Sequence, residues 1–374
     1  MSHAVYGRCP GALAPMRSGD GLVVRVRPHL ARLTAAQVAG LCNAAEAHGA
    51  GLIDLTSRAN LQIRGVCEAA LPALTERLAA LDLLDPDIRT EARRNILVAP
   101  LWTEGDDTHR LARELVSRLG DLPAKAGFAI DAGPGPVLGD APADFRIERG
   151  ASRRLILRAD GRPLGVPLPV GGEIETLVAL VRWFAETGGT ASGRMARHHA
   201  ALPDLPGAGT PEPPAPAREA LRPGPHLRGA VHGLAFGQIA AADLARAMAD
   251  SGATALRVTP WRCLLLETGA PGPRAGLLWD ADAPELRADA CPGAPFCPQA
   301  LAETRSLARA LAPHVSGRLH VSGCAKGCAR PGPADVTLTA TRAGFDLAFA
   351  APAGTPPAES GLSPARLLAR FGAS

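Results

Sequence analysis

The sequence predicts an α+β protein made of two related halves. A strand–helix–strand pattern spans residues 20–66, and the same pattern recurs over residues 234–269. A stretch dense in proline and glycine separates the two copies, and each copy is followed by a further segment of mixed helix and strand. Because internal self-similarity of this kind indicates pseudo-twofold symmetry, we expect the functional centre to lie between the halves.

The first copy contains a strand, a helix and a second strand region. Residues 22–27 alternate like a strand, and Thr34 is a candidate N-cap for a helix over Ala35–His48. Leu52–Leu55 then leads into a further strand over residues 56–65. Polar side chains at positions 58, 62 and 64 fall close to period two in that strand. Part of one face therefore carries polar groups and is not expected to be core.

The second copy repeats this order. A helix is expected over residues 240–250 and ends at Gly252, and residues 255–266 repeat the strand region. An offset of 203 residues superposes Leu61 on Leu264 and places Trp261 where the first copy has Arg58.

Residues 202–226 are expected to form a linker, because their density of proline and glycine excludes a helix or a central strand. Only the segment after the second copy keeps a cysteine motif. The sequence therefore predicts five parts: a first half-domain over 15–80, a first α/β domain over 90–201, the linker, a second half-domain over 227–285 and a cysteine-bearing α/β domain over 286–374.

The composition is that of a globular protein. The 374 residues carry a net charge of +4, with 47% hydrophobic and 20% charged residues. Basic residues are dispersed and only 3% of the chain is aromatic, which argues against a nucleic-acid-binding protein. Residues 1–20 lack the apolar stretch of a signal peptide, and the most apolar helix, expected over 174–185, contains Arg182. Neither secretion nor membrane insertion is expected.

Eight cysteines are present, and half of them fall in one motif. This usage does not predict a disulfide framework, so a reducing, cytoplasmic location is expected. The four outside the motif are expected to be small buried side chains: Cys9, Cys42, Cys67 and Cys263.

The motif consists of two close pairs. Five residues separate Cys291 from Cys297, three separate Cys324 from Cys328, and 26 lie between the pairs. Four thiolates brought to one point suit an iron–sulfur cluster or a tetrahedral zinc ion. The spacing favours the cluster, because structural zinc pairs usually sit closer together than the first pair. Zinc, and buried or disulfide-bonded cysteines, remain alternatives.

The residues around the cysteines fit a cluster-binding loop. Gly293, Gly323 and Gly327 keep bulk away, so that backbone N–H groups can approach sulfur. Residues 299–311 have helical periodicity, which would place one cysteine pair at each end of a helix.

Lysine is rare in this chain. Of the 40 basic residues, 38 are arginine, and the two lysines are Lys125 and Lys326. An ammonium group is a compact point charge, whereas a guanidinium is a broad fixed fork. Lys326 lies inside the cysteine motif and Lys125 just before a predicted strand, so both are candidate functional residues. Chance retention of both on the surface is the alternative.

The cysteine motif, Cys-x5-Cys followed by Gly-Cys-x3-Cys-Ala-Arg-Pro, resembles that of the siroheme-dependent sulfite and nitrite reductases. In that family four cysteines hold a 4Fe-4S cluster, and the last of them also bridges the cluster to the siroheme iron. The resemblance implies two ferredoxin-like half-domains plus two α/β segments, one of which carries the cluster. It implies these cluster ligands: Cys291, Cys297, Cys324 and Cys328.

Three further segments resemble the family in its own order. Residues 56–65 resemble its Thr-x-Arg-Gln-x-x-Gln-x-His-Gly strand, residues 93–95 its Arg-Asn motif, and residues 122–125 its Leu-Pro-x-Lys segment. The catalytic residues implied by the resemblance are Arg58, Arg94 and Lys125. The implied tetrapyrrole-binding residues are Arg58, Gln62, Arg64, Arg93, Arg94, Asn95, Lys125 and Lys326.

Two departures from the family pattern bear on the reaction. Gly127 stands where the reductases have a second lysine, and Arg64 where they have a histidine. Sulfite reduction needs several cations and proton donors around a small dianion, so these changes weaken the reductase interpretation, and Gly127 is expected to open space. A smaller branch of the family, close to this chain in length, instead oxygenates the reduced tetrapyrrole precorrin-3A in aerobic cobalamin biosynthesis.

Resemblance to this branch implies a monooxygenase that converts precorrin-3A to precorrin-3B, using O2 for ring hydroxylation and lactone formation. Arginine forks would bind the acetate and propionate rim of the substrate. Electrons would pass through the cluster from an external donor, either an NADH-linked reductase or a ferredoxin. A siroheme-dependent sulfite or nitrite reductase is the alternative, and a non-catalytic iron–sulfur or zinc protein is a third hypothesis.

The resemblance also suggests an additional non-haem iron, although the sequence shows no spaced ligand triad. His320 and the pair His198 and His199 are candidate ligands, and structural or solvent-facing roles are the alternative. Asp20 and Asp54 could equally serve as caps or turns, so neither is assigned.

Overall fold

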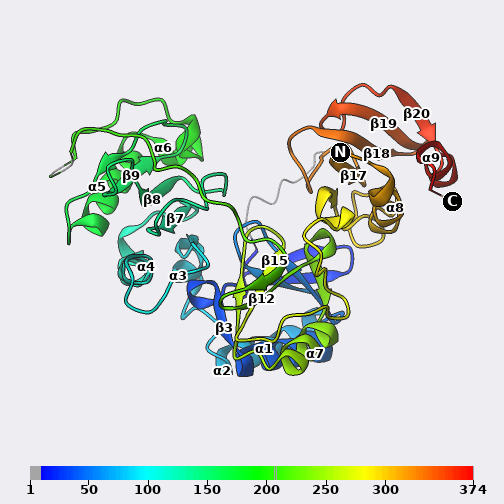
Figure 1. The fold of residues 1–374 in the computed structure, drawn as a ribbon, viewed down its shortest axis with the longest axis horizontal. Helices are drawn as coiled ribbons and strands as arrows, with labels where there is room; N and C mark the ends of the chain where they lie inside the picture. Colours follow the sequence, from blue (N-terminus) through cyan, green and yellow to red (C-terminus); the bar gives the residue numbers. More distant parts are fainter. Residues whose placement is uncertain (1–9, 206, 208, 374) are drawn as a thin grey trace.

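The structure, a computed structural model, describes residues 10–205, 207 and 209–373. Its described part contains four five-stranded sheets. Two of them form a base with helices beneath, and the other two form arms that rise on opposite sides of that base (Figure 1). The predicted α+β class is confirmed. Cys9 and Ser374 lie outside the described residues, as do positions 206 and 208 of the predicted linker.

The two sheets of the base exchange strands. Both are antiparallel, and each takes one edge strand from the other copy of the repeat: β13 pairs with β4, and β3 pairs with β14. The first sheet has the order β1 (Met16–Ser18), β2 (Gly21–Val26), β5 (Leu61–Val66), β4 (Leu52–Leu55) and β13 (Gln238–Ala240). The second has the order β11 (Gly224–His226), β12 (Gly229–Gly233), β15 (Cys263–Glu267), β14 (Ala255–Val258) and β3 (Arg32–Thr34). This reciprocal pairing is the pseudo-twofold relation expected from the repeat.

Three helices belong to the base: α1 (Ala35–His48), α2 (Leu71–Ala80) and α7 (Ala241–Ser251). Helix α1 has the predicted bounds, because Thr34 and Gln37 form a capping box at its start. Gly252 ends α7 in the left-handed conformation, with a φ of 68°. The buried side chains of both copies form one continuous core between these helices and the sheets.

The predicted strand over residues 56–65 is wrong in its first half. Residues 56–60 form a turn, in which the hydroxyl of Thr56 accepts hydrogen bonds from the backbone N–H groups of Arg58 and Asn60. Such side-chain bonds compete with the strand ladder. The second copy breaks in the same way, since Thr259 Oγ1 accepts from the N–H of Trp261. Arg58 therefore lies on a turn rather than on the strand face.

The first arm is built on a mixed sheet of order β10 (Val166–Pro167), β9 (Leu155–Ala159), β8 (Phe145–Arg149), β7 (Phe128–Asp131) and β6 (Ile96–Val98). Its helices are α3 (Ile88–Arg93), α4 (Asp107–Ser117), α5 (Glu173–Glu186) and α6 (Gly189–Ser192). Part of the predicted linker lies against this sheet, since Pro214 and Glu212 form bridges to Gly150 and Gly165.

The second arm has a sheet of order β16 (Ala288–Ala290), β17 (Leu319–Ser322), β18 (Ala334–Thr341), β19 (Gly344–Ala351) and β20 (Glu359–Leu362). Its helices are α8 (Arg305–Leu311) and α9 (Pro364–Phe371). The helix predicted over 299–311 is therefore too long. Residues before Arg305 bond to the cysteine loops instead, since Leu301 N–H donates to the carbonyl of Gly323 and Thr304 Oγ1 to that of Cys291.

Short 3-10 turns join these elements: η1 (His29–Ala31), η2 (Glu68–Ala70), η3 (Leu119–Asp121), η4 (Met195–Arg197), η5 (Ala235–Gly237), η6 (Pro284–Arg287) and η7 (Ala312–His314). None of the helices in the described ranges is both long and apolar enough to cross a membrane.

Burial of one carboxyl group in the first arm gives a testable pH dependence. Burial raises the pKa of Asp131 from 3.8 to about 6, although its side chain accepts hydrogen bonds from Val137 and Leu138 N–H. Its stabilising contribution is thus present below pH 4 and is lost as the pH rises through about 6. Asp131→Asn keeps an acceptor oxygen but does not ionise. We therefore expect the unfolding free energy of this variant, relative to that of wild type, to rise by up to about 3 kcal/mol when the pH is raised from 4 to 7. Denaturant unfolding at both pH values measures this; a pH-independent difference would contradict it.

Candidate functional site

One row of polar side chains crosses the first sheet of the base. In the antiparallel register, Gln62 of β5 lies opposite both Arg25 of β2 and Asp54 of β4, and Asp54 lies opposite Gln238 of β13. Gln238 Nε2 donates to Asp54 Oδ1 at 2.7 Å. With its amide oxygen facing Arg25, Gln62 accepts from Nε and Nη2 at 3.2 and 3.0 Å. The expected polar face is therefore present.

Arg25 is a candidate that the sequence analysis missed. Its signal was available, because Arg25 alternates with the apolar Val24 and Val26, which are both fully buried. A residue between two inward-facing valines must point to the opposite, polar face. Arg25 therefore joins Gln62 on the candidate site.

Arg64 is buried on this face and is held by protein groups. Its guanidinium donates to both carboxylate oxygens of Asp20 at 2.9 and 3.0 Å, to Asp54 Oδ2 at 3.3 Å and to Ser18 Oγ at 3.1 Å. Asp20 and Asp54 thus act as ion-pair partners of Arg64. This arrangement makes Arg64 a positioning residue, because its donors are directed to these groups rather than toward a ligand.

The cysteine loops of the second arm contact the same edge of the sheet. Phe296, next to Cys297, accepts hydrogen bonds through its carbonyl from Ser18 Oγ at 2.8 Å and from Gly19 N–H at 3.1 Å. Arg305, the first residue of α8, places Nη2 3.9 Å from Asp54 Oδ1. The cysteine loops therefore lie against the sheet that carries the polar face.

The four motif cysteines lie near one another. Partial burial raises the pKa of Cys328, and Lys326 lowers it, while the neighbouring thiols of Cys324, Cys291 and Cys297 raise it further. Cys291 is buried, and its Sγ accepts a hydrogen bond from Gly323 N–H at 3.2 Å. N–H groups directed at sulfur are what a cluster thiolate needs. The donor set and this contact fit a 4Fe-4S cluster, which the four cysteines would hold.

A second group of predicted residues meets at the inner end of the first arm. Arg58 and Asn60 from the β4–β5 turn line a small depression together with Arg94 and Asn95. Lys125 is exposed, and its backbone N–H donates to the carbonyl of Ala92, two residues before Arg94, at 3.3 Å. The structure thus brings Arg58 and Arg94 to one depression, whereas Lys125 does not line it.

The other predicted residues differ in their surroundings. Arg94 is buried, and its Nε and Nη2 donate to the two carboxylate oxygens of Asp85 at 2.7 and 2.9 Å. Part of its guanidinium is therefore already hydrogen-bonded to the protein. Arg93 is half-buried, and within the described ranges its side chain makes no ion pair. Lys326 is exposed on the cysteine loop, in the other arm. Gly127 N–H donates to Asp144 Oδ2 at 2.8 Å, and a Cβ at Gly127 would lie in ordinary contact with that oxygen, at 3.4 Å, so the expectation that Gly127 opens space stays a prediction.

The histidines proposed for a non-haem iron do not converge. His198 bonds to Thr187 Oγ1 at 2.8 Å and packs edge-on against Trp183, which is a structural role. His199 is exposed, and His320 is fully buried on β17. In the part of the chain that the structure describes, no three His, Cys, Asp or Glu side chains gather around one point as ligands of a single metal ion.

Comparison with known proteins identifies the class. Residues 14–81 match the family model of the nitrite/sulfite reductase ferredoxin-like half domain. The structure is similar to that of the NirA protein of Mycobacterium tuberculosis, with a TM-score of 0.60 and 20% identity over 90% of this chain and 76% of that one. The fold is thus of the sulfite/nitrite-reductase type, as the sequence predicted.

A curated relative shows to which family within this class the chain belongs. The precorrin-3B synthase of a Sinorhizobium species is 32% identical over 410 aligned positions, which cover 98% of this chain and 88% of that protein. The chain belongs to the precorrin-3B synthase family, an enzymatic branch of this fold that acts in cobalamin biosynthesis.

Proposed function

We propose that the chain is an oxidoreductase that converts precorrin-3A to precorrin-3B in aerobic cobalamin biosynthesis. The observation that carries this proposal is the polar face of the first sheet, with Arg25 and Gln62, lying directly against the loop that holds Cys291 and Cys297. The similarity to a precorrin-3B synthase over nearly the whole chain supports it. A reducing, cytoplasmic location is part of the proposal.

The substrate is a reduced tetrapyrrole with a rim of acetate and propionate groups. Arg25 and Arg58 would bind this rim, because guanidinium groups pair with carboxylates, and the amide N–H2 group of Gln62 would add a neutral donor. Arg64 would hold the polar face of the first sheet in position through its ion pairs with Asp20 and Asp54. Lys125 and Asn95 would approach from the first arm, and Arg93 and Lys326 would add positive charge at the edges of the site.

The reaction consumes O2 and electrons. One oxygen atom enters the ring carbon beside ring A as a hydroxyl group and the other leaves as water. This step requires two protons from solvent and two electrons from an external NADH-linked reductase or ferredoxin. When bound to the four cysteines, the 4Fe-4S cluster supplies one-electron transfer. An acetate carboxylate of the substrate closes the lactone. A further non-haem iron remains part of the proposal, with no ligands assigned.

The absorption spectrum of protein purified without air tests this proposal, together with iron and acid-labile sulfide assays. Absorption of an iron–sulfur cluster without an intense haem-type band, followed by O2-dependent turnover of precorrin-3A, is the expected result. A strong band from extractable siroheme, with reduction of sulfite or nitrite, would replace the proposal by the siroheme-dependent reductase alternative.

Replacing Arg58 by Ala tests the binding face. Arg58 lies on a turn at the depression that Arg94 and Asn95 also line. Loss of its guanidinium, which would pair with one substrate carboxylate, should weaken precorrin-3A binding by about tenfold to one hundredfold. The quenching of substrate fluorescence or absorbance on titration measures this. Arg89→Ala removes an exposed guanidinium from α3 as a matched control. Unchanged affinity of the Arg58 variant would remove Arg58 from the site.

A further inference from the structure

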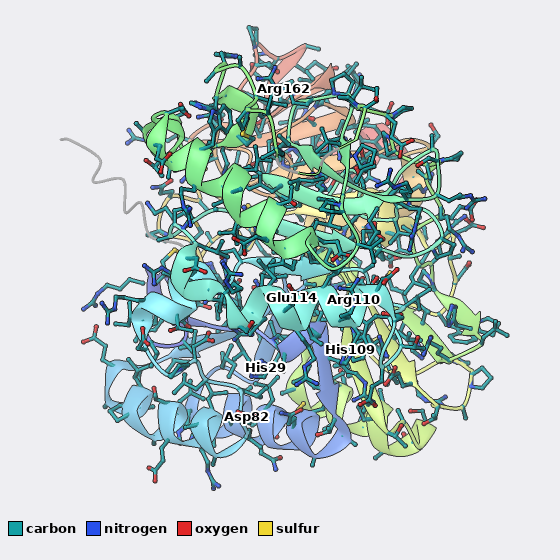
Figure 2. The ribbon with its side chains drawn as sticks, turned by 90° about the vertical axis from the view of Figure 1, so that its left-hand side faces the viewer. His29, Asp82, His109, Arg110, Glu114 and Arg162 are labelled. Carbon is teal, nitrogen blue, oxygen red and sulfur yellow. The ribbon has the colours of Figure 1, made fainter. Side chains whose placement is uncertain are left out.

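A cavity of about 460 Å³ lies beside the candidate site, between α4 of the first arm and the loop that follows β2. Figure 2 faces this flank, with His109 on α4 and His29 of the loop beside each other. None of the motif cysteines and none of the polar row of the first sheet lines it. It meets the depression at Arg58 only through shared walls: Asn60, Arg94 and Ile96.

The charged side chains on the walls are all basic. Arg27, Arg94 and Arg113 line the cavity, and no Asp or Glu is among the described residues that do. Arg27 and Arg94 are buried and are partly balanced from behind by Glu91 and Asp85. Arg113 is exposed and makes no ion pair in the described part of the chain. The cavity therefore presents net positive charge.

The neutral polar groups on the walls offer further hydrogen-bond donors. His109 Nδ1 accepts from Gly105 N–H at 3.1 Å, so in the neutral ring Nε2 carries the proton and is a donor. The amide of Asn60 adds another donor. Burial and the charge of Arg94 lower the pKa of His29, in keeping with a positive potential here.

The rest of the lining is apolar and the volume is that of an organic ligand. Pro28, Leu30, Val98 and Val116 form this part of the wall. An inorganic anion would leave such surface uncovered, whereas a cavity of a few hundred Å³ suits a small organic molecule. Leu30 also has a φ of 50° and is fixed by Trp102 Nε1, which donates to its carbonyl. The wall is thus built in a conformation that is uncommon for leucine.

We propose that this cavity is a second binding site, for a small organic anion with an apolar body and one or two carboxylate groups. The ligand lies between α4 and the 28–30 loop, with its carboxylates at Arg113 and Arg27 and its body on the apolar wall. The site stands independently of the reaction proposed above.

Titration of the whole protein with 2,6-naphthalenedicarboxylate, a rigid fluorescent dianion, tests the site, with the neutral 2,6-naphthalenedimethanol as the comparison. We expect saturable binding of the dianion at least tenfold tighter than binding of the diol. Arg113→Ala should weaken the dianion about tenfold or more, since Arg113 is exposed and its removal leaves the fold intact. Ser117→Glu, which adds a carboxylate to the exposed end of the lining, should weaken it as well.

Arg89→Ala is the matched control, because it removes the same charge from an exposed position that does not line the cavity. It should bind the dianion as wild type does. Equal affinity for dianion and diol, or equal affinity of the Arg113 and Arg89 variants, would overturn the proposal. Neither outcome depends on precorrin-3A turnover, so failure here is distinguishable from failure of the proposed reaction.

Discussion

Replacing Cys328 by Ser is expected to remove the iron–sulfur cluster while the chain stays folded. A hydroxyl is a much poorer iron ligand than a thiolate. With only three cysteines left, one of the four iron atoms has no thiolate ligand from the protein. Cys328 is the most exposed of the four, so its replacement disturbs little packing. Iron and acid-labile sulfide per chain should fall close to zero, together with the visible absorption and O2-dependent turnover.

Cys67→Ser provides the control for this experiment. Cys67 is also exposed, so the expectation that it is buried is wrong, and it follows β5 on the base rather than lying in the motif. It should keep full iron and sulfide, and the circular dichroism of both variants should match wild type. Full iron and sulfide in the Cys328 variant would mean that this residue is not a cluster ligand.

Features encoded by neighbouring residues could be predicted from the sequence. The start of α1 was predicted because Thr34 and Gln37 are close in the chain and satisfy each other's backbone groups. The repeat was predicted because its offset is visible in the residues themselves. The strand over 56–65 was predicted wrongly, since an apolar alternation does not reveal that the Thr56 hydroxyl holds a turn.

The partners of the site residues could not be predicted, because they are distant in the sequence. Arg64 finds Asp20, which precedes it by 44 residues, and Arg94 finds the carbonyl of Arg27, at a separation of 67. The sequence identified these arginines by resemblance and assigned their forks to a ligand. Only the fold shows that much of each fork is directed to protein groups, whereas Arg25 could have been found from its alternation with Val24 and Val26.

Loss of the Asp54 carboxylate should destabilise the protein by about 3 kcal/mol, because three groups from different parts of the chain depend on it. Asp54 is buried and accepts from Arg64 of β5 and from Gln238 of the second copy, and it lies 3.9 Å from Arg305 in the second arm. In Asp54→Ala, Arg64 keeps Asp20, but the half-buried Gln238 loses its hydrogen-bond acceptor and the half-buried Arg305 loses its ion-pair partner. The midpoint of urea unfolding measures the loss.

Two further variants distinguish the loss of the negative charge at Asp54 from the effect of removing any carboxylate. Asp54→Asn keeps an acceptor for Gln238 but removes the negative charge between Arg64 and Arg305, so we expect an intermediate loss of stability. Asp282→Ala removes a carboxylate that pairs with Arg222 on the exposed surface, which should cost less than about 1 kcal/mol. If Asp54→Ala were no more destabilising than Asp282→Ala, the buried carboxylate would not join the base to the second arm. A loss in the expected order would make Asp54 the link between the polar face and the cysteine loops.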